Sequence, residues 1–231
     1  MASGDQQIIL EDGLPVRLRR SARARRMTLR VPRDGSGVLL TLPSHVPVDV
    51  GRAFAESRRG WLDQAVARLP ARQVAVAGAR LPVEGRGLVL TPAQVRQPQV
   101  QDDRLLIPQG RPMGPTAAAW LKHLALVRLR AACDRFSAAL GRPYSAIALR
   151  DTRSRWGSCT QDGRLMFSWR LAMAPALVLD YVAAHEVAHL AHMDHSIRFW
   201  RQVESLMPGH ASHRAWLRAH GADLMLWQFR D

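Results

Sequence analysis

The sequence predicts an α+β fold, in which a β-rich, basic N-terminal region with one helix (residues 1–112) precedes a more helical region (residues 113–231). Three observations support this prediction. Short segments of the first region alternate apolar and polar residues, which is the pattern of half-buried strands. The second region opens on a long segment with helical periodicity. It also contains an H-E-x-x-H motif inside the almost wholly apolar segment 177–190, where a buried helix is expected.

The first region consists mainly of expected strands. One segment, residues 49–69, has apolar residues at helical spacing, and Pro70 ends that pattern. A polar segment at residues 94–103 is expected to form an exposed loop. Period-two alternation and turn residues predict strands at 16–20, 27–31, 38–42, 81–83, 88–90 and 105–107.

The second region is expected to begin with a helix at residues 116–140, which Gly141 ends. Strands are expected at 145–150 and 165–171, with a turn at Asp162 and Gly163 before the second strand. Pro175 is well placed to start the helix that carries the H-E-x-x-H motif. Two further helices are expected, one at 197–207 capped by Ser196 and one from Ser212 to Gly221.

Length and composition indicate a globular protein with one sizeable core or two small domains, because the chain has 231 residues. The longest apolar run, residues 171–179, is too short to span a bilayer, so we expect no membrane partner. The first residues show no secretory pattern. Cys133 and Cys159 are far apart in the sequence, which excludes a disulfide framework. A cytoplasmic location is therefore expected.

The chain is strongly basic, with a formal net charge of +14 that arises almost entirely from arginine. This charge favours an anionic partner such as DNA, RNA or a nucleotide, although a basic protein need not have one. A cluster without acidic residues lies near the N-terminus, and on a β-hairpin part of it would form one charged face. Few aromatic residues are interleaved with this cluster, which argues against base stacking. The candidate phosphate-binding residues are Arg17, Arg19, Arg20, Arg23, Arg25 and Arg26, with Arg30 close by.

The H-E-x-x-H motif predicts a metal site. Residues four apart lie on the same face of a helix, so His185 and His189 can direct two imidazole nitrogens at one Zn²⁺ ion. Glu186 lies on the flank of that face and can accept a proton from water. Burying these three side chains without partners would cost several kcal/mol, roughly, and a metal ion supplies the partner. The alternative is a buried hydrogen-bonded cluster without metal.

A catalytic zinc ion usually has three protein ligands, and two histidines are candidates for the third. His192 would remain on the metal face if the helix continued, but ligands spread along one straight helix lie too far apart to reach one ion. His195, just before the next expected helix, is favoured because a turn can bring it back. Glu204 is a weaker candidate. The spacing equals that of the metzincin signature, but His192 stands where that signature has glycine, so a metzincin is not expected.

Several motifs together resemble the YgjP-like metallopeptidase-type proteins, which are similar in turn to the SprT and Wss-type zincins. The matching stretches are residues 154–159 (SRWGSC), 167–171 (FSWRL), 179–190 (LDYVAAHEVAHL), 194–196 (DHS) and 198–200 (RFW). The resemblance implies a zincin-like core with one zinc ion per chain held by His185, His189 and His195, and Glu186 as general base. Asp194 stands where the family often has asparagine. This departure does not affect any of the expected ligands.

The leading functional hypothesis is a zinc-dependent metallopeptidase that cleaves a peptide or protein with a zinc-bound water activated by Glu186. An extended substrate is expected to pair with an edge strand, and the strand at 165–171 is the candidate because it directly precedes the H-E-x-x-H helix. One alternative is a metal-dependent nucleoside triphosphate hydrolase. Another is a non-catalytic nucleic-acid-binding protein with structural zinc, against which Glu186 argues because a structural site needs no base. Trp156, Trp169 and Tyr181 are expected in the core, and Cys159 is expected to be a structural thiol.

Overall fold

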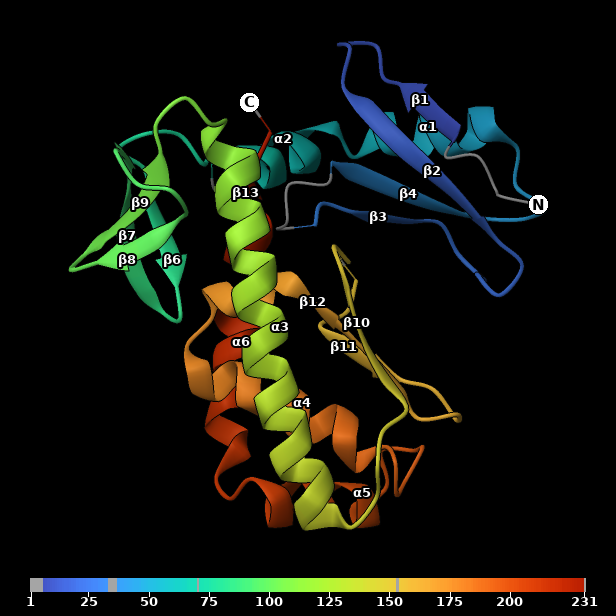
Figure 1. Cartoon of the computed structure of the whole chain (residues 1–231). Helices are drawn as coiled ribbons and strands as arrows, with labels where there is room; N and C mark the ends of the chain where they lie inside the picture. The colour runs from blue at the N-terminus through green and yellow to red at the C-terminus, as the bar shows by residue number, and fades with distance from the viewer. Residues whose placement is uncertain (1–5, 33–36, 70, 153, 231) are drawn as a thin grey trace. The chain divides into compact units, whose positions relative to one another are not determined.

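The computed structural model describes residues 6–32, 37–69, 71–152 and 154–230, and it confirms the α+β fold (Figure 1). The chain forms two compact units, Met1–Arg72 and Gln73–Asp231. The sequence predicts a division after residue 112, whereas these units divide after Arg72. The physical reason is that the apolar residues of the strands between residues 80 and 108 share one core with the following long helix.

The first unit contains a four-stranded sheet in the order β1-β2-β4-β3. Strand β4 pairs with β2 in parallel and with β3 in antiparallel orientation, and β1 is antiparallel to β2. The arginine-rich strands β2 and β3 therefore lie on opposite sides of β4, so the expected hairpin between them is wrong. The bounds are Gln6–Ile9 for β1, Pro15–Ser21 for β2, Thr28–Arg30 for β3 and Val38–Pro43 for β4.

Two helices, α1 (Val48–Ser57) and α2 (Arg59–Ala67), pack their apolar side chains with those of this sheet. The single helix expected at 49–69 is wrong, because Arg58 leaves the helical conformation with φ −106° and ψ 15°. Trp61, one of the apolar residues of this segment, is exposed. The core of this unit consists of Ile8, Leu10, Val16, Leu18, Val38, Leu40, Leu42, Ala55 and Leu62.

The second unit begins with a small sheet in the order β6-β7-β9-β8. Strand β8 falls in the polar segment expected to be a loop, and its three residues are exposed as expected but paired with β9. A separate pair joins β5 (Gln73–Val74) to β13 (Trp227–Gln228) near the end of the chain. The sheet strands are β6 (Arg80–Val83), β7 (Arg86–Ala93), β8 (Gln99–Gln101) and β9 (Arg104–Pro108).

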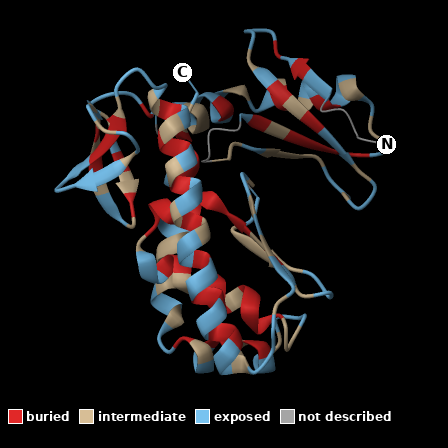
Figure 2. Ribbon diagram, viewed as in Figure 1, coloured by how far each residue is buried: buried red, intermediate tan, exposed pale blue. Residues whose placement is uncertain are grey.

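The long helix α3 (Met113–Leu140) is the backbone of the second unit, and Gly141 ends it in the left-handed conformation, as predicted. Its buried residues recur every three or four positions and form one stripe along the helix (Figure 2). That stripe packs in one core with the short 3₁₀ helix η1 (Trp169–Met173) and with helix α4 (Ala176–Ala188). None of the described helices has the length and apolar character that a membrane span requires.

A three-stranded sheet, in the order β10-β12-β11, completes the framework of the second unit. Strand β12 (Arg164–Ser168) lies in the middle, parallel to β10 (Ala146–Arg150) and antiparallel to β11 (Gly157–Cys159). The strand expected at 165–171 is therefore shorter than predicted, since its last residues turn into η1. Strand β11 has no apolar alternation, which is why the sequence did not predict it.

Helix α4 follows Pro175, and helix α5 (Ile197–Leu206) is capped by Ser196, both as predicted. The Ser196 hydroxyl accepts the Phe199 backbone N–H at 3.5 Å. The last helix, α6 (His210–Met225), begins before Ser212 and continues through Gly221, so both expected ends are wrong. Gly221 serves close packing instead, because a Cβ there would lie 3.0 Å from the Trp156 ring.

A candidate metal centre on helix α4

The C-terminal part of helix α4 carries His185 and Glu186 of the H-E-x-x-H motif, and His189 follows directly as the C-cap residue of the helix. Its apolar residues place it inside the core of the second unit, so these polar side chains are carried into a largely dry environment. Glu186 is only 5% exposed and His189 only 8%. A buried carboxylate beside buried imidazoles needs a compensating partner.

Three imidazoles converge at this point. The nearest ring nitrogens of His185, His189 and His195 all lie within 4.8 Å of one another. The Nε2 atoms of His185 and His195 are 3.2 Å apart. Two ligands about 2.0–2.1 Å from a tetrahedral zinc ion would be separated by roughly 3.4 Å. The donor set and the His185–His195 separation are therefore compatible with a metal ion such as zinc, and the described residues contain no other cluster of histidine, cysteine or carboxylate groups that could hold one.

A tight turn after α4 brings His195 back to the helical pair. The backbone N–H groups of Leu190 and Ala191 donate to the carbonyls three residues earlier, which ends the helix. Asp194 then accepts the Ser196 N–H at 3.0 Å and fixes the entry into α5. The structure thus gathers His195, and not the side chain of His192, with His185 and His189.

His192 contributes through its backbone. Its carbonyl accepts a hydrogen bond from His189 Nδ1 at 2.9 Å. This bond fixes the tautomer of His189 and leaves Nε2 as the unprotonated nitrogen, the form that a metal ion requires. Glu204 is engaged elsewhere, since its carboxylate accepts the Gly209 N–H and contacts His210.

Aromatic packing orients the three imidazoles further. The fully buried Phe199 ring lies with its centroid 4.9, 4.4 and 4.8 Å from those of His185, His189 and His195. His185 Nδ1 is buried without a hydrogen-bond partner among the described residues, so packing holds that ring instead. Sequence reasoning included Phe199 in a matching motif but missed its packing role, for which its position four residues after His195 on a capped helix is the available signal.

Burial controls the charge of the site. It lowers the pKa of His185 to about 3, with the neighbouring histidines contributing, and it also lowers the pKa of His189. Both rings are therefore neutral at pH 7, as metal ligands must be. Burial raises the pKa of Glu186 to about 8, against the opposing effect of Arg155. A cation among the histidines would favour the ionised carboxylate.

Strand β11 passes directly over the glutamate. A Cβ atom on Gly157 would lie 2.5 Å from Glu186 Oε1, closer than any ordinary contact. Only glycine therefore allows the strand backbone to approach the carboxylate this closely. Sequence reasoning missed the role of Gly157, because nothing in the local pattern indicates a contact with a residue 29 positions later.

An open groove of about 530 Å³ lies beside these groups. Strand β11 lines it through Gly157, Ser158 and Cys159, together with the histidines and Glu186. The strand at 165–171, expected to be the substrate-binding edge, is instead central in its sheet, so that expectation is wrong. Strand β11 is the edge strand beside the candidate metal centre, because it is the last strand of the sheet on that side.

Comparison with known proteins identifies the family. A family model described as a YgjP-like metallopeptidase domain matches residues 25–220. The chain belongs to this YgjP-like family. It therefore carries a metal-dependent peptidase domain of the hydrolase class.

The comparisons with solved structures and with curated proteins add no further evidence for the family. The crystal structure of the metallopeptidase zymogen of Pyrococcus abyssi abylysin is similar at 21% sequence identity, covering 40% of this chain and 92% of that one, with a TM-score of 0.36. No curated protein matches the chain significantly.

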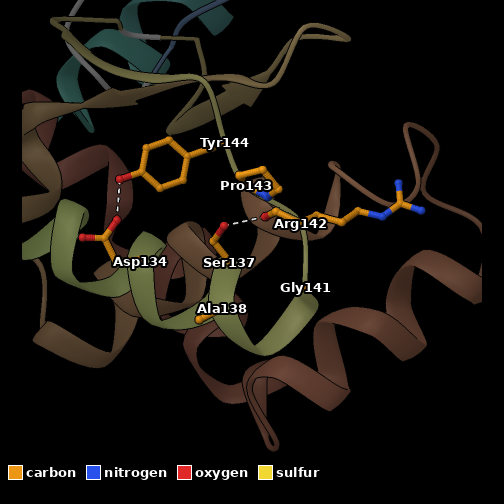
Figure 3. Close-up of a pocket in the computed structure, with 7 residues that line it drawn as sticks. All are labelled: Asp134, Ser137, Ala138, Gly141, Arg142, Pro143 and Tyr144. Carbon is orange, nitrogen blue, oxygen red and sulfur yellow. Dashed lines mark hydrogen bonds between the residues drawn. The ribbon is translucent and has the colours of Figure 1, made fainter.

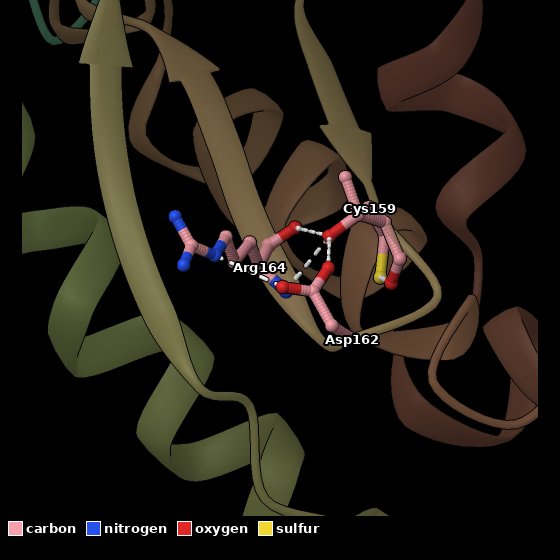
Figure 4. Close-up of polar contacts among 4 residues, drawn as sticks. Cys159, Asp162 and Arg164 are labelled. Atoms are coloured by element: carbon pink, nitrogen blue, oxygen red, sulfur yellow. Dashed lines mark hydrogen bonds and ion pairs between the residues drawn. The ribbon is translucent and has the colours of Figure 1, made fainter.

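The β11–β12 turn of this YgjP-like protein holds the edge strand in place. The Thr160 hydroxyl donates to Asp162 and accepts the Arg164 N–H at 3.1 Å, and Arg164 Nε donates to Asp162 at 2.9 Å (Figure 4). The turn at Asp162 and Gly163 is thus confirmed. Cys159 is half-buried and its thiol donates to the Thr160 carbonyl, and burial raises its pKa to about 11. This environment is that of a structural thiol.

A second hollow of about 580 Å³ lies where α3 ends (Figure 3). Its polar groups satisfy one another: the Tyr144 hydroxyl donates to Asp134, and the Ser137 hydroxyl donates to the Arg142 carbonyl. Burial and the Asp134 hydrogen bond raise the pKa of Tyr144 to about 12. The hollow therefore has a structural role.

The six candidate arginines all belong to the first unit, whereas the histidine cluster belongs to the second. Arg20 donates to the backbone carbonyls of Ser44 and Val46 at 2.8 and 3.2 Å, which gives it a structural function. Arg19 donates to the Thr41 hydroxyl at 3.3 Å. Five of the six arginines are exposed, and Arg17 is half-buried. The exposed ones are Arg19 and Arg20 on β2 and Arg23, Arg25 and Arg26 on the segment after it.

Proposed function

We propose that this protein is a zinc-dependent metallopeptidase in which His185, His189 and His195 hold one zinc ion and Glu186 is the general base. The convergence of three imidazoles beside a buried carboxylate carries this proposal. When bound, the ion would acidify a water molecule and polarise the substrate carbonyl.

The protein groups have distinct tasks in this reaction. The imidazoles of His185 and His189 remain neutral, since burial depresses the pKa of both. Glu186 accepts the water proton and passes it to the leaving amine. Burial supports this second step, because a carboxyl group in a dry site holds a proton more tightly than one in water.

The substrate would be an extended peptide that pairs with the edge strand β11. The strand lines the open groove beside Glu186, and its unpaired backbone groups can form hydrogen bonds with a peptide backbone. Gly157 supports this arrangement, because a larger residue would displace the carboxylate.

The alternatives have weaker support. Hydrolysis of a nucleoside triphosphate requires several cations for the phosphates, and among the described residues Arg155 is the one arginine that lines the groove. A structural zinc site is normally closed by four protein ligands, whereas this cluster offers three and opens to solvent. We also propose a cytoplasmic location, which the two unpaired cysteines support.

Metal content tests the proposal directly. The protein is purified without a histidine tag or added metal, and zinc is measured by plasma mass spectrometry. We expect about one zinc per chain, lost in His195→Ala and retained in His192→Ala, since only the His192 carbonyl contacts the cluster. Glu186→Gln should retain zinc but lose hydrolysis of a denatured protein substrate. No zinc in the wild type, and none taken up on titration, would refute the proposal.

A further inference from the structure

A groove of about 420 Å³ lies within the first unit, between the edge strand β3 and the two helices. Residues 26–29 form one wall, and Phe54, Arg58 and Trp61 of the α1–α2 segment form the other. The sequence separates these aromatic residues from the arginine cluster by more than 20 positions. The fold brings them together, so aromatic rings and cations do share one surface.

The aromatic part of the groove is accessible. Trp61 is 49% exposed, and of the seven tryptophans, all of which the structure describes, it alone is exposed. Phe54 is half-buried beside it in the lining, with the Arg58 guanidinium 6.0 Å from its ring centroid. An exposed flat indole beside a cation offers a stacking surface for another planar ring.

The cations of the groove are not neutralised by the protein. Within the described ranges, neither Arg26 nor Arg58 forms an ion pair. Two of the three acidic residues of the same helices are occupied, since Glu56 accepts the Glu11 N–H at 2.7 Å and Asp63 pairs with Arg59 at 2.9 Å. Residues 1–72 contain 13 arginines and seven acidic residues. The groove therefore favours a polyanion.

Further arginines lie on the sheet near this groove. Arg30 is on β3 itself, and the register places it in one row with Leu39 of β4 and Arg17 of β2. Arg19 shares a row two residues further along with Thr28, which lines the groove. With about 4.8 Å between neighbouring strands, Arg19 lies roughly 10 Å from β3. An extended chain leaving the groove would thus meet additional cations.

We propose that this groove binds single-stranded nucleic acid, with one base stacked on Trp61 and the adjacent phosphates contacting Arg26 and Arg58. Repeated negative charge matches the arginines, and a planar base matches the indole. Bases in a duplex are stacked inside and cannot reach a side chain in this way, which selects a single strand. An acidic peptide would satisfy the cations but would leave the indole without a partner.

The test measures fluorescence anisotropy of a fluorescein-labelled 20-nucleotide oligothymidylate with the full chain at several salt concentrations. We expect Trp61→Ala to weaken binding roughly 5- to 150-fold, the range for loss of one stacked base, and Trp61→Phe to restore most of it. Arg26→Ala and Arg58→Ala should each lower the slope of log affinity against log salt by about 0.7, whereas Trp61→Ala should leave this slope unchanged.

Matched controls separate the groove from general charge and from folding. Val50→Ala alters an exposed apolar residue of α1 outside the lining, and Arg104→Ala removes an exposed arginine of the second unit. Both should bind as the wild type does, and thermal denaturation checks that every variant folds. Equal binding of a duplex, stronger binding of polyglutamate, or wild-type affinity in the Trp61 and arginine variants would overturn the proposal.

Discussion

Replacing Gly157 by alanine should impair catalysis far more than folding. The added Cβ would lie 2.5 Å from Glu186 Oε1, 2.6 Å from Cγ and 2.8 Å from Cδ. Ordinary contacts are about 3.5 Å or longer, so the carboxylate must move by roughly 1 Å. All three atoms belong to the flexible Glu186 side chain, and alanine is allowed at this backbone position because its φ is not positive.

The displacement should therefore be absorbed mainly by Glu186. The stability cost should be near the lower end for overpacking, about 1 kcal/mol. A misplacement of about 1 Å in a catalytic group costs roughly 100-fold in rate. We expect Gly157→Ala to retain one zinc per chain and to melt close to the wild type, while kcat/KM falls about 100-fold.

The assay compares zinc content, thermal denaturation and hydrolysis of a denatured protein substrate in the same preparations. Gly60→Ala is the matched control, since a Cβ at this helical glycine meets nothing within 4 Å. It should leave activity unchanged and stabilise the fold by up to about 1 kcal/mol. Wild-type activity in Gly157→Ala would refute the reasoning, as would a loss of folding, because the contact would then not be absorbed by Glu186.

Three further outcomes are expected. Arg170→Met should destabilise the protein by about 3 kcal/mol or more in urea denaturation, because buried Arg170 donates to the Leu224 and Trp227 carbonyls at 3.0 Å and pairs with Asp151. As a control, Arg164→Met changes an exposed arginine and should cost less than about 1 kcal/mol. Burial raises the pKa of the Cys133 thiol to about 12. This thiol should therefore react with iodoacetamide at pH 8 far more slowly in the native protein than after unfolding. Equal rates in the two states would contradict its burial. The hydrogen bond from the Gly209 N–H, and to a smaller extent the contact with His210, lowers the pKa of Glu204. The ionised Glu204 should therefore stabilise the fold above pH 4.3, roughly the unfolded pKa, and this stabilisation should be lost as the pH falls below that value. Glu204→Gln should flatten this part of a profile of melting temperature against pH, and an unchanged profile would contradict the prediction.

The sequence predicts the elements whose signal is local. Helix α3 ends at Gly141 and α5 begins after Ser196, because cap residues act through their own backbone neighbours. The histidine pair is equally local, since a spacing of four residues defines one helix face. The break between α1 and α2 at Arg58 and the continuation of α6 through Gly221 were not predicted, because tertiary packing decides whether a helical pattern is interrupted or extended.

The parts of the site that escaped prediction depend on contacts between distant residues. Strand β11 has three half-buried residues without alternation, so only its pairing with β12 identifies it as a strand. The same pairing moves β12 from the edge to the centre and transfers the expected substrate contact to β11. The approach of Gly157 to Glu186 follows from that placement, which no sequence pattern records.

The position of His195 shows how local and distant effects combine. Ser196 caps α5 by accepting the N–H of Phe199, and the Phe199 ring packs against the three imidazoles. The cap therefore fixes both the backbone next to His195 and the ring that packs against it. In the proposed metal site, these contacts among protein groups would help to hold His185, His189 and His195 in place. Such preorganisation would allow the proposed site to keep one side free for substrate, and the groove lined by β11 lies on that side.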